Sequence, residues 1–140
     1  MCNYTFTFDI PMPPISVNHT HMTIRNGMRI KKKETRIWES EFRDYILANY
    51  FQEVSEITKT FDGKKNCLAV RYWFYLPLIT KKGLISKRAG DLDNWLKMPN
   101  DMLINKILGL DDSLIVDLMA KKSHSLKPLI SIEIEILTYS

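Results

Sequence analysis

The chain has 140 residues, 45% of them hydrophobic, and this predicts one domain over residues 1–140 with a single core. Its net charge of +4 favours an anionic partner such as nucleic acid. Its two cysteines, Cys2 and Cys67, exclude a disulfide framework and a zinc site, so we expect a reducing, cytoplasmic setting. The first ten residues lack a secretory pattern, and no apolar run reaches the roughly 20 residues of a membrane span, so we expect no membrane association.

The first half of the chain predicts a strand, a hairpin and a long helix. Residues 4–10 alternate and are mostly β-branched or aromatic, which predicts a strand. Residues 21–30 predict a β-hairpin, in which Asn26-Gly27 supplies the two positive φ angles of a type I′ turn. Apolar residues then recur every four positions, which predicts one amphipathic helix over about residues 34–57.

The second half predicts a central strand, a basic loop and a second helix. Residues 67–76 are rich in aromatic and β-branched side chains, which is typical of a buried strand. Residues 77–90 form the loop, and the helix follows over about residues 93–108, with Gly109 as its C-cap. Pro99 lies inside this helix and removes one backbone hydrogen bond, so we expect a kink there.

Two further strands complete the chain, at residues 113–122 and 129–137. In the last of these, isoleucines alternate with polar residues, which indicates one buried face. The order of elements is strand, hairpin, helix, strand, helix, strand, strand. This order predicts an α+β fold with a mixed β-sheet and two main helices packed on it.

Two pairs of acids stand out against the basic composition. Asp91 and Asp93 lie where the loop enters the second helix, and residues two apart in an extended segment point the same way. Asp93 is also a candidate N-cap, with Lys97 four residues later on the same helix face. Asp111 and Asp112 follow at the start of the next strand, and their spacing alone leaves open which of them joins the first pair.

Converging carboxylates raise one another's pKa and destabilise a fold unless a cation binds them. Mg²⁺, or alternatively Mn²⁺, prefers such oxygen ligands, completed by water and substrate phosphate. A metal of this kind activates an attacking water, while Lys97 neutralises charge that develops on the phosphate. The alternative is a helix cap followed by a surface ion-pair ladder of Asp93, Lys97 and Asp101, with no metal.

Basic residues near these acids predict a phosphate-binding rim, whose affinity for DNA would fall with salt. The alternative is that these loops are simply polar and rich in lysine. The predicted DNA-binding residues lie in or after the hairpin and in the loop before the acids: Arg25, Arg29, Lys31 and Lys32, then Lys81, Lys82, Lys87 and Arg88.

The acidic motif resembles that of the RusA family of Holliday-junction resolvases: Asp91-Leu92-Asp93-Asn94-x-x-Lys97, then Asp101, then Asp111-Asp112 before a β-rich stretch with Val116 and Lys121. The opening Pro13-Pro14 with Ser16 and Asn18 is similar to the start of the same family, and the order of elements agrees over nearly the whole chain. Two departures are the inserted Ile15 and Gly90, where the family often has arginine.

The resemblance implies a homodimeric, Mg²⁺- or Mn²⁺-dependent endonuclease that resolves four-way DNA junctions by paired symmetric nicks, in recombination and repair. Many family members are carried by phages or prophages. By motif, Asp91, Asp93 and Asp112 correspond to the catalytic, metal-binding acids and Lys97 to the catalytic lysine. Two alternatives stay open: a non-catalytic junction-binding protein, and a metal-dependent nuclease that acts on other branched DNA.

Overall fold

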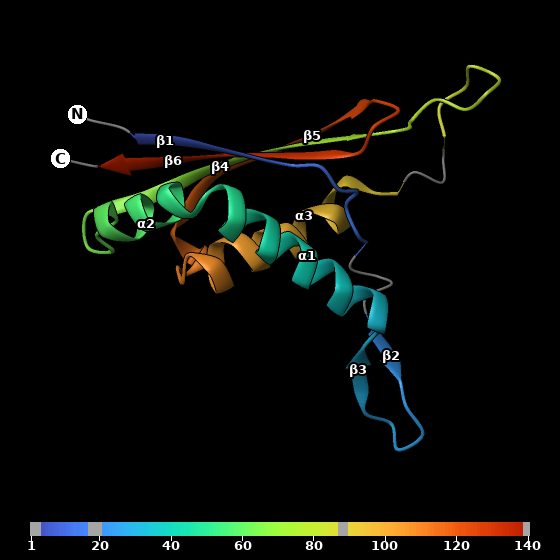
Figure 1. Cartoon of the computed structure of the whole chain (residues 1–140), viewed down its shortest axis with the longest axis horizontal. Helices are drawn as coiled ribbons and strands as arrows, with labels where there is room; N and C mark the ends of the chain where they lie inside the picture. The colour runs from blue at the N-terminus through green and yellow to red at the C-terminus, as the bar shows by residue number, and fades with distance from the viewer. Residues whose placement is uncertain (1–3, 17–20, 87–89, 139–140) are drawn as a thin grey trace.

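A four-stranded mixed sheet lies at the centre of the fold, in a computed structural model that describes residues 4–16, 21–86 and 90–138. β4 pairs in parallel with β5 and antiparallel with β6, which also pairs antiparallel with β1. Figure 1 shows the helices on one face of this sheet, and the predicted α+β fold is confirmed. The strands, in sheet order, are β1 (Tyr4–Ile10), β6 (Leu129–Thr138), β4 (Asn66–Leu76) and β5 (Ile115–His124).

The first predicted helix is in fact two, α1 (Lys33–Asn49) and α2 (Phe51–Thr60). Tyr50 leaves helical geometry, with φ −130° and ψ 26°, and its hydroxyl accepts a hydrogen bond of 3.0 Å from the backbone N–H of Asp9 in β1. The apolar repeat nevertheless continues across the break, and Val54 beyond it is buried. Periodicity therefore predicted the buried face but missed the break, because Tyr50 fits the same repeat.

The hairpin forms as a small second sheet of β2 (His21–Thr23) and β3 (Arg29–Lys31). The predicted type I′ turn is wrong, because Gly27 has a positive φ of 83° and Asn26 does not. The N–H of Gly27 donates to the carbonyl of Ile24 at 2.9 Å. A longer loop of this kind needs only one left-handed residue, and glycine adopts that conformation without steric cost.

The face of the sheet that meets the helices is apolar. The isoleucines of β6 are fully or almost fully buried, as their alternation predicted, and they join one core cluster with residues from β1, β4 and the helices. The other face carries charge, since Arg71 forms ion pairs with Glu133 at 2.7 Å and Glu135 at 3.2 Å. Within the described ranges, none of the helices combines the length and the apolar character needed to cross a bilayer.

The second predicted helix changes its hydrogen-bond register partway along. It begins as α3 (Leu92–Asn100), which contains Pro99, and continues as a π-helical segment, η2 (Asp101–Ile107). Near its end the N–H of Leu108 donates to the carbonyl of Leu103, five residues back, at 2.9 Å. Proline has no N–H to donate and its ring crowds the preceding turn, so the interruption predicted at Pro99 takes the form of this wider register.

Candidate functional site

Asp91 and Asp93 lie at the start of α3, where the chain leaves the long loop. Asp91 is the N-cap residue, with φ −92° and ψ 138°, and its carbonyl accepts a hydrogen bond of 3.1 Å from the N–H of Asn94. The prediction of Asp93 as the N-cap is therefore wrong, since it lies in the first turn. Both carboxylates are exposed, and that of Asp91 makes no capping hydrogen bond, so the pair faces solvent.

Glycine is required just before Asp91. Gly90 has a φ of 104°, and a Cβ atom there would lie 2.7 Å from the indole nitrogen of Trp95, which gives a physical reason for glycine in place of arginine. The buried Trp95 ring packs edge-on against Phe74 at 5.8 Å between centroids. From β5, Lys122 donates to the carbonyl of Gly90 at 3.1 Å and lies 5.4 Å from the centre of the Trp95 ring. These contacts tie the end of β5 to the segment that carries Asp91.

Asp112 lies at the opposite end of β5. It begins a 3₁₀ turn, η3 (Asp112–Leu114), which leads directly into β5 at Ile115. At about 3.3 Å per residue, the strand from Ile115 to Lys122 spans about 23 Å. Among the described residues, no group of three or more acidic, histidine or cysteine side chains is placed to hold a metal. Within the described part of one chain, Asp91, Asp93 and Asp112 therefore do not make up such a group.

The parallel pairing of β4 with β5 explains where the two acid pairs lie along the chain. A parallel connection must carry the chain back along the sheet before the next strand begins, and here α3 and η2 do so (Figure 1, yellow to orange). Asp91 and Asp93 lie where this connection starts, and Asp112 lies where it ends.

Asp111 and Asp112 differ in what their side chains do. The Asp111 carboxylate caps η3 by accepting the backbone N–H of Ser113 at 2.9 Å, and this hydrogen bond lowers the pKa of Asp111. Asp112 is exposed and lies within the turn rather than at its cap. The engagement of Asp111 favours Asp112 as the acid that acts on an external ligand.

Asp101 is a neighbour of both Lys97 and Asp112. Burial raises the pKa of Asp101, the charge of Lys97 opposes this rise, and the charge of Asp112 adds to it. The charges of Lys106 and Lys31 also lower the pKa of Asp101, so acidic and basic groups both act on this carboxyl group. Behind them the buried Tyr72 hydroxyl donates to the side-chain oxygen of Asn100 at 2.6 Å, which fixes the middle of the connection to β4.

The predicted DNA-binding residues lie on two separate projections, apart from Lys87 and Arg88, which are outside the described residues. Figure 1 shows that the β2–β3 hairpin and the loop after β4 extend in different directions from the sheet. The exposed members are Arg25 and Arg29 on the hairpin and Lys81 and Lys82 on the loop, whereas Lys31 and Lys32 are half-buried.

A basic hollow that the sequence analysis missed lies between α1 and η2. Glu39 within it pairs with Lys106 at 3.0 Å and with Lys31 at 2.8 Å. Burial raises the pKa of Glu39, but hydrogen bonds from the two lysines outweigh that effect and hold it below its usual 4.5. Arg36 and Arg43 stand about two helical turns apart on α1 and leave the hollow positively charged, which suits a phosphate. Its volume is about 250 Å³, and its lining residues are Arg36, Glu39, Ser40, Arg43, Met102 and Lys106.

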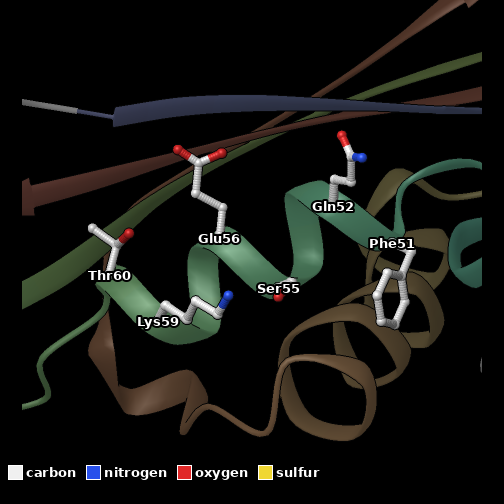
Figure 2. A pocket seen from close by; sticks show the side chains of 6 residues that line it. All are labelled: Phe51, Gln52, Ser55, Glu56, Lys59 and Thr60. Carbon is white, nitrogen blue, oxygen red and sulfur yellow. The ribbon is translucent and has the colours of Figure 1, made fainter.

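A further hollow of about 340 Å³ runs along α2, and Figure 2 shows that all its lining side chains come from that helix. It contains none of the predicted site residues, and we assign it no role. The residues are Phe51, Gln52, Ser55, Glu56, Lys59 and Thr60.

Comparison with protein-family models gives a match over most of the chain. The family model described as Endodeoxyribonuclease RusA matches residues 11–135. This span includes both acidic pairs, Lys97 and every predicted DNA-binding residue. A search of curated protein sequences gives no significant match.

Proposed function

The chain belongs to the RusA family of endodeoxyribonucleases, and we propose that it is a Mg²⁺-dependent nuclease that resolves four-way DNA junctions by paired symmetric nicks in recombination and repair. The observation that carries the proposal is the family match, which spans both acidic pairs and Lys97. The positive charge of the chain and its basic projections support a DNA substrate.

The exposed pair of Asp91 and Asp93 fits a hard divalent cation. Mg²⁺ is usually held by one or two carboxylates, together with waters and substrate phosphate, and Mn²⁺ accepts the same ligands. When bound, such a cation polarises the phosphoryl oxygen and lowers the pKa of the attacking water. Lys97 is exposed one helical turn after Asp93, where its ammonium group would neutralise charge that develops on the phosphate.

We propose that the third acid, Asp112, reaches this pair from a second copy of the chain. Among the described residues of one chain, Asp112 does not join Asp91 and Asp93 in a group placed to hold a metal. A twofold dimer in which each site takes Asp112 of the partner subunit would complete two equivalent sites, one for each strand that must be cut.

Mixing two inactive variants tests this arrangement. Asp93→Asn and Asp112→Asn should each abolish cleavage of a synthetic four-way junction in Mg²⁺, while both still bind it. If sites are shared between subunits, a mixed dimer holds one intact site and one doubly damaged site, so cleavage returns on mixing. If each site belongs to one subunit, both sites of the mixed dimer are damaged and no activity returns. The absence of recovery, with subunit exchange verified by mass spectrometry, would refute the shared site.

A second candidate function is junction binding without cleavage, which the separation of the acids within one chain favours. Binding with no nicking in Mg²⁺ or Mn²⁺, across many junction sequences, would support it. A third candidate is cleavage of other branched DNA. Comparing four-way junctions with flaps, forks and duplex under the same conditions would distinguish it from the main proposal.

A further inference from the structure

The loop after β4 contains a small hairpin over residues 78–86 that projects beyond the sheet. Ile79 and Ile85 form an antiparallel bridge, and the N–H of Thr80 donates to the carbonyl of Leu84 at 2.7 Å. Figure 1 shows it as the yellow-green loop that extends away from the sheet and the helices. It is therefore a hydrogen-bonded projection that the core does not cover.

This hairpin exposes apolar side chains that the fold does not use. Leu84 is 64% exposed and Ile85 is 82% exposed. Outside the hairpin, Leu126 in the β5–β6 turn is also 82% exposed. Lys81 and Lys82 are exposed beside them. Apolar groups on a projecting tip gain free energy when a partner removes them from water, and the two lysines favour an anionic partner.

The base of this hairpin lies next to the segment that carries Asp91. Nδ1 of His124 accepts the backbone N–H groups of Leu78 at 3.0 Å and Ile79 at 3.3 Å. Lys122, on the same strand, holds the carbonyl of Gly90. At about 3.3 Å per residue, Lys122 and His124 lie about 7 Å apart along β5. The end of β5 therefore anchors both the hairpin and the start of the acidic segment.

We propose that the hairpin is a wedge that inserts Leu84 and Ile85 between bases at the branch point of the DNA, an inference that rests on the proposed function. Apolar side chains inserted at a base step unstack it and kink the duplex. Lys81 and Lys82 then contact the adjacent phosphates. A second copy of the chain or a bilayer would also cover an apolar tip. The two lysines favour DNA phosphate, and the hairpin base lies beside the segment that carries the proposed cleavage site.

The test uses four-way junctions with 2-aminopurine, a base that fluoresces more strongly when unstacked, placed either at the branch point or within an arm. In EDTA, binding of the full chain should raise fluorescence at the branch point and not in the arm. The double variant Leu84→Ser/Ile85→Ser should lose that rise and, in Mg²⁺, cleave about tenfold more slowly at saturating protein. Its affinity for duplex DNA should be unchanged.

Phe51→Ser is the matched control, because Phe51 is 65% exposed on α2, outside the hairpin, and its loss should leave the fluorescence rise intact. A full rise in the double variant would overturn the wedge. Two other results for the double variant would also overturn the wedge. If it is a monomer where the wild type is a dimer, a second copy of the chain covers the tip. If the wild type binds lipid vesicles and the double variant does not, a bilayer covers it. The readout in EDTA needs no cleavage, so a fluorescence rise without nicking in Mg²⁺ would refute the proposed nuclease and keep the wedge.

Discussion

Replacing Gly90 by alanine should lower the free energy of unfolding more than the same change at Gly27 or Gly109, which also have a positive φ. The positive φ of 104° costs about 1–2 kcal/mol for a residue with a side chain. The added methyl group would also lie 2.7 Å from the indole nitrogen and 3.0 Å from the nearest ring carbon of Trp95. That ring is buried against Phe74, so relieving the clash should cost about a further 1–3 kcal/mol. The expected loss of unfolding free energy is about 2–5 kcal/mol.

Gly109→Ala is the matched control. The C-cap of the second helix is Leu108 and not Gly109 as predicted. Gly109 follows it with a φ of 67°, and a Cβ atom there meets nothing within 4 Å. Only the backbone cost of about 1–2 kcal/mol should remain. Both changes stiffen the unfolded chain equally, so that effect cancels in the comparison. Urea unfolding followed by circular dichroism measures the free energy of unfolding of both variants. If Gly90→Ala and Gly109→Ala lose equal amounts of it, the contact with Trp95 does not have the role given to it.

Three other variants test separate parts of the structure. Tyr72→Phe removes the buried hydroxyl that bonds Asn100 and should cost about 1–2 kcal/mol in urea unfolding; an unchanged stability would show that water replaces it. Folding lowers the pKa of Glu39, so the wild type should have a higher free energy of unfolding than Glu39→Gln above pH 4.5, and this difference should shrink as the pH falls below 4.5. A difference that stays constant with pH would exclude the ion pairs as its source. If the basic hollow binds DNA phosphate, Arg36→Gln/Arg43→Gln should lower the slope of log affinity against log salt by about 0.9 per lost contact, and an unaltered slope would remove the hollow from the DNA path.

Local sequence patterns predicted most of the sheet because each strand carries its own signal. The alternation in β6 was enough to identify its buried face, and β1 begins and ends at the predicted residues. The break at Tyr50 was not predictable in this way. It depends on a contact with Asp9, far away in sequence, while its side chain still fits the helical repeat.

For the candidate site, the sequence predicted which elements carry the first acids and Lys97, but not where Asp112 lies relative to them. The spacing of Asp93 and Lys97 indicated their shared helix, because a helix fixes the relation of residues one turn apart. Asp91 was expected in the extended segment before the helix, and it is the N-cap. The position of Asp112 depends instead on the parallel pairing of β4 with β5, and no local pattern encodes which strands pair or in which direction. The basic hollow was missed for the same reason, since Lys106 reaches Arg36 and Arg43 only through the packing of η2 on α1.

The change of register after Pro99 has a consequence for how this part of the chain can vary. A π-helical segment is related to an α-helix by the insertion of a residue, so η2 stores surplus length. Deleting one residue there would let the segment rewind as an α-helix while β5 kept its pairing. Natural relatives could therefore gain or lose a residue at this point and so rotate Lys97 relative to Asp112, without rebuilding the sheet.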